Sequence, residues 1–271
     1  MTSLRLNFFI LSLLFVFTSR SFAAPAELEI TALDTGYADC FVIQSPDGKN
    51  ILLDSGDTEK PDLPADFLKQ KGISRLDLII LSHPHKNHFG AMFRVLKEIE
   101  VREIVWNGDT HQEDPFSSLL ALIKEKKIPL RALKAGDKLK ISGDLEFTVF
   151  HPAGDMTENI NNNALVLRMV YGKTSALFTT DVGYGVQNDL IKKYGKKLVS
   201  DIVQVPHHGG PVSEKFIKFF KPDFFVLSTG PNEWGQPRED QMTRLQSPVL
   251  RTDKDGNIIF RSDGKKIQRV I

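Results

Sequence analysis

Three histidines stand close together in the sequence and could hold a metal ion. His83, His85 and His88 fall within six residues, directly after a near-continuous apolar run from Leu76 to Leu81. Imidazole nitrogens are the commonest metal ligands in proteins, and residues at i and i+2 on extended backbone point to the same side. After a turn, the third histidine can reach the same ion or a neighbouring one. The spacing therefore predicts a metal site that follows a buried strand.

Two carboxylates and a second pair of histidines could complete this site. Asp54 and Asp181 each end an apolar run, and the adjacent His207 and His208 follow a third run. Polar residues at strand ends are where a sheet scaffold commonly builds a site, although aspartate also ends strands in ordinary turns. A ligand set of His and Asp without sulfur favours zinc, with manganese or iron as alternatives.

The elements that must position these residues are short strands and helices. Strands grouped in meanders, with a helix inserted at intervals, predict two sheets packed on each other with helices outside. The apolar patterns predict helices over 64–71, 91–99, 116–126, 186–194, 213–220 and 241–245. The same patterns predict strands over 28–33, 40–44, 50–53, 76–81, 103–106, 139–141, 145–150, 164–171, 175–179, 202–205, 224–228, 258–261 and 266–270.

The N-terminal residues have the pattern of a secretory signal. Arg5 precedes an apolar run from Leu6 to Phe17, and Ser21 and Ala23 are small residues before a cleavage point. A permanent membrane anchor is the alternative, but the run is shorter than the roughly 20 residues that a membrane span needs. We therefore expect a signal peptide over 1–23, one domain over 24–271, and a secreted or periplasmic protein without a stable membrane anchor after cleavage.

Composition and charge limit the partners of the chain. The 271 residues are 41% hydrophobic and 25% charged, which is ordinary for a globular protein. The net charge of +1 becomes −1 (+1 minus 2) without the two basic residues of the signal. A charge this small does not favour nucleic acid as a partner, although it leaves nucleic acid possible. Cys40 is the single cysteine, so no intrachain disulfide can form.

The histidine motif resembles the signature of the metallo-β-lactamase superfamily, which is His-x-His-x-Asp-His after a buried strand. The chain is similar, in particular, to the hydrolase domain of ComEC-type DNA-uptake proteins and their secreted relatives. The segments that follow this pattern in order are 33–39, 53–56, 83–88, 161–167, 180–181, 205–209, 232–237 and 251–253. This resemblance covers nearly the whole chain after the signal. It implies the α/β (α+β) fold class, as an αββα sandwich.

The resemblance also implies a role for each matching residue. His83 and His85 match ligands of a first metal, His88 matches a ligand of a second, and Asp181 matches a carboxylate that bridges both metals. The last ligand matches His207, with the neighbouring His208 as the alternative. Among the other matching positions, Asp54 is expected to orient a ligand, Asp39 to hold its loop near the site, and His151 to lie near a third ligand position of the first metal.

Two positions depart from the family pattern. Asn87 stands where the superfamily has an aspartate that commonly binds the second metal and holds the nucleophilic water. An amide is a poorer ligand and no general base, so we expect weaker binding of the second metal, or none. Gln236 stands where a histidine is expected, which removes a proton donor or a substrate contact. Asn87 and Asp181 are the predicted catalytic residues, and Asn87 largely decides between an altered enzyme and an inactive one.

The resemblance implies a secreted zinc hydrolase with one or two Zn²⁺ ions. A bound metal lowers the pKa of a water molecule to about 7 and so supplies hydroxide at neutral pH. A phosphodiester is the implied substrate, in nucleic acid or in a small molecule with a phosphocholine-like headgroup. The alternatives are hydrolysis of lactam, lactone or thioester bonds, and a catalytically impaired binding protein on the same fold.

Overall fold

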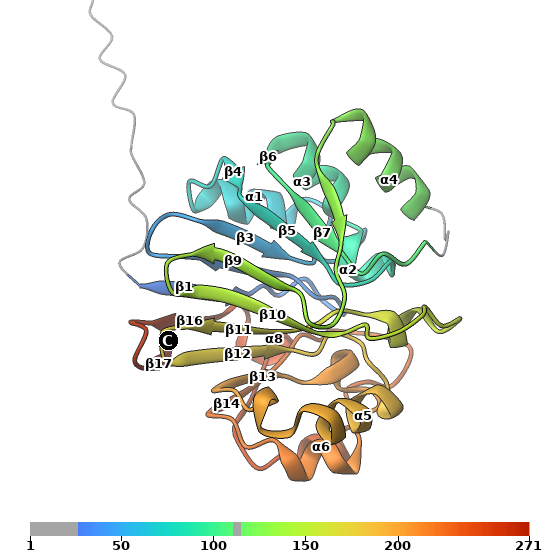
Figure 1. The fold of residues 1–271 in the computed structure, drawn as a ribbon, viewed down its shortest axis with the longest axis vertical. Helices are drawn as coiled ribbons and strands as arrows, with labels where there is room; N and C mark the ends of the chain where they lie inside the picture. Colours follow the sequence, from blue (N-terminus) through green and yellow to red (C-terminus); the bar gives the residue numbers. More distant parts are fainter. Residues whose placement is uncertain (1–26, 111–114, 271) are drawn as a thin grey trace, which may run out of the picture.

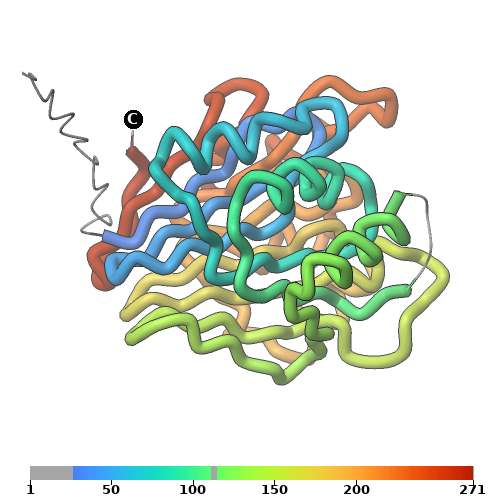
Figure 2. The backbone as a smooth tube through the Cα atoms, turned by 90° about the horizontal axis from the view of Figure 1, so that it is seen from above, coloured from blue at the N-terminus to red at the C-terminus, as the bar shows by residue number. Residues whose placement is uncertain are grey.

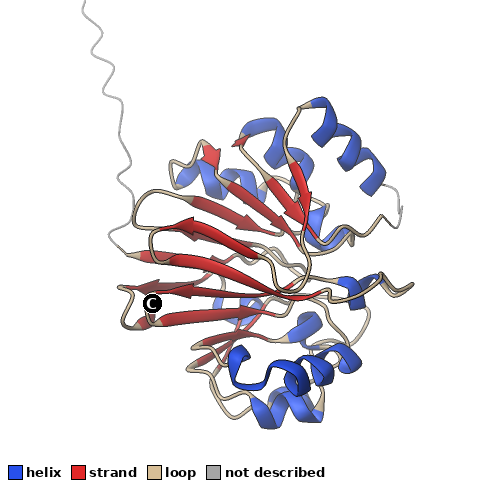
Figure 3. Ribbon diagram, viewed as in Figure 1, coloured by secondary structure: helices blue, strands red, loops and turns tan. Residues whose placement is uncertain are grey.

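Two β-sheets pack face to face, and helices cover the outer face of each, which confirms the predicted αββα sandwich (Figures 1 and 3). This arrangement comes from a computed structural model, which describes residues 27–110 and 115–270. The expected signal peptide over 1–23 lies outside the described residues. Within the described ranges, no helix is long and apolar enough to cross a membrane.

The first sheet joins both ends of the described chain. Its order is β17-β16-β1-β2-β3-β5-β7-β8, with β3, β5, β7 and β8 parallel and the other pairs antiparallel. The bounds are β1 Leu28–Ala32, β2 Phe41–Gln44, β3 Asn50–Leu53, β5 Leu78–Leu81, β7 Ile104–Trp106, β8 Leu130–Ala132, β16 Ile258–Ser262 and β17 Ile267–Val270. Figure 2 shows the first strand in blue beside the last strands in red.

The second sheet repeats this division into a parallel and an antiparallel part. Its order is β15-β14-β13-β12-β11-β10-β9, and strands β12 to β15 are parallel. The bounds are β9 Lys138–Ser142, β10 Leu145–His151, β11 Val166–Tyr171, β12 Thr174–Phe178, β13 Ile202–Gln204, β14 Phe224–Leu227 and β15 Val249–Arg251. A separate pair is formed by β4 Arg75–Leu76 and β6 Glu100–Val101.

Three apolar layers hold the sandwich together. The middle layer lies between the sheets and includes the buried Ile43, Leu53 and Phe147. The outer layers lie between each sheet and its helices, and the strands buried on both faces accordingly have nearly continuous apolar sequences. The helices over the first sheet are α1 Leu63–Gln70, α3 Met92–Glu98 and α4 Phe116–Glu125; those over the second are α5 Tyr184–Tyr194, α6 Glu214–Phe219 and α7 Glu239–Met242.

Short turns of helix follow several strands at the edge where the candidate residues lie. They are α2 Lys86–Phe89, η1 Ile160–Asn163 and η3 Pro206–Gly209; of the two further turns, η2 Gly195–Leu198 precedes β13 and α8 Thr252–Asp255 follows β15. A backbone hydrogen bond joins the loops of the two sheets at this edge, where Leu165 N donates to Ser82 O at 3.0 Å. Within the second sheet, His207 N donates to Thr180 O at 2.8 Å and joins the loops after β12 and β13. The loops that carry the predicted site residues therefore meet.

Candidate metal centre

The loop after β5 brings two histidines to Asp181. β5 ends at Leu81, and the chain then runs through His83 and His85 into the short helix α2. His83 Nε2 lies 3.1 Å from His85 Nδ1 and 3.7 Å from Asp181 Oδ2. One ligand atom from each of these three residues lies within 4.8 Å of the others. We call them the first ligand group.

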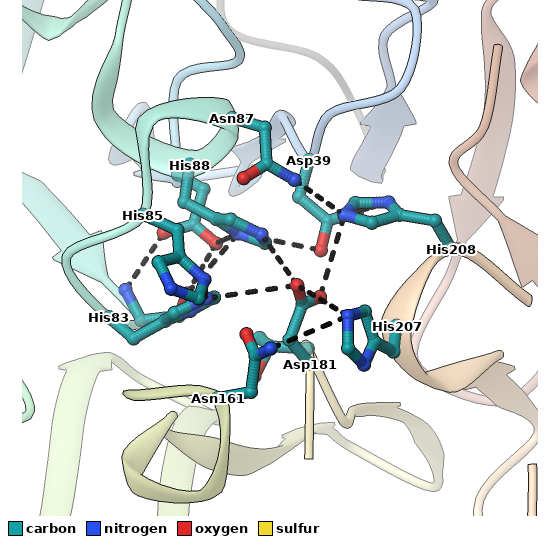
Figure 4. A network of polar contacts seen from close by, with 12 residues as sticks. Asp39, His83, His85, Asn87, His88, Asn161, Asp181, His207 and His208 are labelled. Carbon is teal, nitrogen blue, oxygen red and sulfur yellow. Dashed lines mark hydrogen bonds and ion pairs between the residues drawn. The ribbon is translucent and has the colours of Figure 1, made fainter. Parts of the chain in front are cut away.

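A second ligand group shares Asp181 with the first. It consists of Asp39, His88, Asp181 and His208, all buried, with one ligand atom from each within 4.8 Å of the others. His88 Nε2 lies 3.2 Å from Asp181 Oδ2, and His208 Nε2 lies 3.5 Å from Asp181 Oδ1. Figure 4 shows Asp181 between the histidines of the two groups. The arrangement has the form expected for a carboxylate that serves two adjacent cations.

Hydrogen bonds behind the second group turn its imidazoles toward Asp181. The Nδ1 atom of His88 lies 2.8 Å from Asp54 Oδ2, and the Ser82 backbone N–H and hydroxyl donate to the same carboxylate. His208 Nδ1 donates to the Ser228 carbonyl at 2.9 Å. Because Nδ1 is engaged in both rings, Nε2 is the atom that faces the site. Asp54 thus lies behind His88, in contact with a candidate ligand as expected.

The charges of this buried cluster are strongly coupled. Burial alone would lower the pKa of His88, but the carboxylates of Asp181 and Asp54 outweigh burial and hold that pKa well above its usual range. Burial would raise the pKa of Asp181, yet His88 and His208 hold it well below its usual range. Burial lowers the pKa of His83, which favours the neutral imidazole that metals bind.

Unpaired polar atoms test whether these residues fit a metal ion. Asp39 Oδ1, His88 Nε2 and Asp181 Oδ1 are all buried and form no hydrogen bond, although His88 Nε2 lies 3.2 Å from Asp181 Oδ2 and Asp181 Oδ1 lies 3.5 Å from His208 Nε2. Buried polar atoms in folded proteins are nearly always paired, so three such atoms in one ligand group indicate a missing partner of positive charge. Two carboxylates and imidazole nitrogens are ligands that zinc accepts. The residues present therefore fit a divalent cation.

His207 and His208 lie differently with respect to the site. His208 belongs to the second ligand group, whereas His207 belongs to neither group, with its Nε2 3.9 Å from Asp181 Oδ2 and 3.5 Å from Asn161 Nδ2. Both residues have positive φ, 51° and 53°, in a tight turn after β13. Successive side chains in such a turn point in different directions. The geometry therefore favours His208, the alternative of the sequence analysis, over His207.

The two departures from the family pattern both line the site. Asn87 Nδ2 lies 2.8 Å from His208 Nε2, the nitrogen that faces Asp181. Gln236 Oε1 accepts a hydrogen bond from the Tyr37 hydroxyl. His151, by contrast, is in neither ligand group, because its Nε2 lies 2.7 Å from the Asn162 carbonyl and donates to it. The catalytic role of Asn87 stays a prediction.

A cavity of about 710 Å³ opens at Asp181, Asn87 and His207. Trp234, 66% exposed, stands at this cavity and stacks on Tyr37 with 5.0 Å between the ring centroids. Tyr37 packs in turn on the ring of His208, at 4.4 Å. Three acidic side chains and one lysine also line the cavity, namely Asp57, Glu59, Glu233 and Lys86. This aromatic pair was not predicted from the sequence.

Comparison with known proteins places the chain among proteins of one fold. The profile of the metallo-beta-lactamase superfamily matches residues 33–230. "ComE operon protein 3" of Bacillus subtilis (strain 168) is 29% identical over 277 aligned positions, which cover 93% of this chain and 35% of that protein. "Competence protein ComA" of Neisseria gonorrhoeae is 26% identical over 255 positions, covering 90% of this chain and 34% of that protein. The chain thus spans about a third of the length of both relatives.

Solved structures show the same architecture at low sequence identity. The metallo-beta-lactamase fold protein YhfI from Bacillus subtilis superposes with a TM-score of 0.56 at 14% identity. The superposition covers 87% of this chain and 100% of that one. At this identity the likeness concerns the fold alone.

Proposed function

This chain belongs to the metallo-beta-lactamase superfamily, as a hydrolase of the ComEC-type subgroup, and we propose that it is a zinc-dependent phosphodiesterase. The observation that carries the proposal is the position of Asp181. Its Oδ2 lies 3.7 Å from His83 Nε2 and 3.2 Å from His88 Nε2, so one carboxylate joins both ligand groups. Paired cations held by a shared carboxylate are a common solution for phosphodiester hydrolysis.

Different residues of the chain would bind the metal ions and position their ligands. His83, His85 and Asp181 would hold one zinc ion, and the second ligand group would hold another. When bound, zinc supplies hydroxide near neutral pH and neutralises charge on the phosphate. Asp54 and Ser82 keep the His88 ring in place. Burial and Asp181 raise the pKa of Tyr37, so its hydroxyl stays protonated and keeps its hydrogen bond to Gln236 at the cavity wall.

The lining of the cavity favours a small substrate over nucleic acid. The relatives are competence proteins by name, which points to nucleic acid. The acidic side chains at the cavity outnumber its one lysine, however, and would repel a run of phosphates. The exposed face of Trp234 can instead hold a cationic or apolar group through its ring. We therefore propose a phosphodiester that carries a small headgroup, such as a phosphocholine-like one.

Hydrolysis of model diesters tests this function. Zinc-loaded protein should release p-nitrophenol from bis(p-nitrophenyl) phosphate, and a chelator should stop the reaction. We expect a higher kcat/KM for p-nitrophenyl phosphorylcholine than for its uncharged 3,3-dimethylbutyl analogue or for the p-nitrophenyl ester of thymidine 5′-phosphate. His83→Ala should abolish turnover, whereas His151→Ala, outside both ligand groups, should retain it. Preference for the thymidine ester would instead favour nucleic acid.

Asn87 favours one second candidate, a binding protein without catalytic activity on the same fold. An amide in contact with His208 cannot act as a general base, so the site could hold a ligand without cleaving it. Zinc-loaded protein that binds phosphorylcholine but turns over none of the diesters would support this candidate. Turnover that depends on His83 would exclude it.

We also propose export of the chain with removal of residues 1–23. The support is the pattern of Arg5, the apolar run after it and Ala23. The mass of the protein recovered from a periplasmic extract or from culture medium tests this proposal. A mature chain that begins at Ala24 is expected, and an intact Met1 in the membrane fraction would contradict it.

A further inference from the structure

We propose that Asp39 supplies to the second metal the carboxylate that Asn87 lacks. The inference rests on the metal-dependent function proposed above, and it concerns which side chain of this chain binds the ion. From the sequence alone, Asp39 is expected only to hold its loop near the site. The structure instead places Asp39 in the second ligand group with His88, Asp181 and His208.

The backbone puts Asp39 directly beside position 87. Asp39 N donates to the Asn87 carbonyl at 3.1 Å, and the Asp39 carbonyl accepts from Gly56 N at 2.8 Å. These two bonds fix the residue between the histidine loop and the loop after β3. Both side chains also lie beside His208, with Asn87 Nδ2 2.8 Å from His208 Nε2 and Asp39 Oδ1 4.0 Å from His208 Nδ1.

A buried glutamine binds one oxygen of Asp39, and the other oxygen has only a 4.0 Å contact with His208 Nδ1. Gln204 Nε2 donates to Asp39 Oδ2 at 2.6 Å, while Gln204 Oε1 accepts from Thr180 N at 2.9 Å. Asp39 Oδ1 is buried without a hydrogen-bond partner. A carboxylate with only a structural role would be expected to have both oxygens paired when it is buried. Asp39 has the arrangement of a ligand with one oxygen anchored and one available.

The proposed ligand set keeps the charge that a dication needs. It has two carboxylates, Asp39 and Asp181, and two imidazoles, His88 and His208. A set with aspartate at position 87 in place of Asp39 would contain the same two kinds of ligand in the same numbers. Four ligands of these types suit tetrahedral zinc. Asp39 would therefore keep a second metal in the site even though Asn87 is a poor ligand.

Zinc stoichiometry tests the inference without reference to activity. Metal-free protein is dialysed against zinc at controlled free concentration, and bound zinc is measured by mass spectrometry. We expect two zinc ions in the wild type and one in Asp39→Asn. The second ion should bind at least about 100-fold more weakly in this variant. Mutation of a residue that only hydrogen-bonds to a metal ligand already lowers metal affinity by about 10–100-fold. Asp34→Asn, in the same loop and partly exposed, is the matched control and should keep both ions.

A second variant tests the substitution of one carboxylate for the other. In Asp39→Asn combined with Asn87→Asp, the lost carboxylate returns at position 87, and we expect two zinc ions again. A crystal soaked with zinc gives a readout that does not depend on whether the variants fold. Anomalous scattering should place Asp39 Oδ1 about 2.0–2.2 Å from one ion.

The outcomes separate this inference from the proposed function. Two tightly bound ions in Asp39→Asn, or fewer than two in the wild type, would overturn the role of Asp39. If both ions bind, the second depends on Asp39 and no diester is cleaved, the proposed function fails and the inference stands. If cleavage depends on His83 but the second ion does not depend on Asp39, only the inference fails.

Discussion

Asp181 lies 3.2–3.9 Å from four histidines, His83, His88, His207 and His208. The last two are neighbours in the chain, and one of them is the last ligand of the second metal. His208 Nε2 lies 3.5 Å from Asp181 Oδ1, whereas His207 Nε2 lies 3.9 Å from Oδ2 and outside both ligand groups. His208→Ala should therefore remove one zinc ion and lower kcat/KM at least about 100-fold. Loss of a metal ligand must lower metal affinity and activity more than loss of a residue that only hydrogen-bonds to a ligand. His207→Ala, the matched control, should keep both ions. Loss of an ion in His207→Ala alone would restore the assignment made from the sequence.

Asn87 contacts His208 at the nitrogen that would bind the metal. The amide must leave His208 Nε2, 2.8 Å away, before an ion can bind there. Asn87→Asp removes this donor and adds a carboxylate. We expect the variant to bind the second zinc more tightly, by about 10-fold or more, and to hydrolyse diesters faster. Competition with a fluorescent chelator measures the affinity. An unchanged affinity would show that position 87 does not contact the second metal.

Most of the candidate site could be predicted from the sequence because its residues follow apolar strands. His83, His85, His88 and Asp181 are brought together as their spacing and strand-end positions indicate. Which of His207 and His208 faces the metal site could not be predicted, because this depends on a turn in which both residues have positive φ. The position of the Asp39 side chain could not be predicted either, because it depends on a hydrogen bond from Gln204, a residue 165 positions away. Contacts of that range leave no local pattern.

The short helix α2, which carries His88, depends on a close backbone contact at its end. A Cβ atom at Gly90 would lie 2.4 Å from Thr58 N and 2.6 Å from the carbonyl carbon of Asp57. Gly90→Ala should therefore lower the free energy of unfolding by about 1–3 kcal/mol and weaken zinc binding, since the histidine loop must shift. Gly185→Ala in α5 meets no atom within 4 Å and should be neutral or stabilising. Urea unfolding measures the free energy of unfolding of both variants. An equal change in Gly90→Ala and Gly185→Ala would contradict the role of the close contact at Gly90.

Glu29 on β1 links this strand to two other elements through ion pairs. Its carboxylate lies 2.6 Å from Lys71 Nζ after α1 and 2.9 Å from Arg261 Nη2 on β16. Burial would raise the pKa of Glu29, but Lys71 and Arg261 outweigh burial and hold the pKa below its usual range. A depressed pKa contributes stability above the unfolded pKa of about 4.3, and this stability is lost as the pH falls through the folded pKa.

Glu29→Gln should therefore lower the free energy of unfolding at pH 7 by about 1 kcal/mol, because both partners are partly exposed and screened. The difference from the wild type should shrink as the pH falls below about 4.3, the unfolded pKa. Urea unfolding at pH 7 and at successive lower values measures it. A difference that stays constant with pH would contradict the ion-pair argument.

Elements with strong apolar patterns were predicted closely, and elements without them were not. The strand over 50–53 has the bounds expected from its sequence, and α4 differs by one residue at its end. β8 was not predicted, because all three of its residues are exposed at the edge of the sheet and have no apolar pattern. The four-residue helix α2 was not predicted either, since a single turn has no periodicity to detect.

The whole molecule is built so that the candidate metal centre joins its two halves. Asp39, His83 and His88 come from loops of the first sheet, whereas Asp181 and His208 come from loops of the second. Zinc that binds only the folded chain must stabilise it, by about 2.7 kcal/mol for each site at a free concentration 100 times Kd. For a domain of this size, one such site should raise Tm by about 5–10 °C.

Differential scanning calorimetry with and without a chelator measures this zinc-dependent shift in Tm. Asp181→Asn, which removes the shared carboxylate, should lose most of the increase, and Asp34→Asn should keep it. An equal zinc-dependent shift in Asp181→Asn would mean that zinc binds somewhere other than between the two sheets.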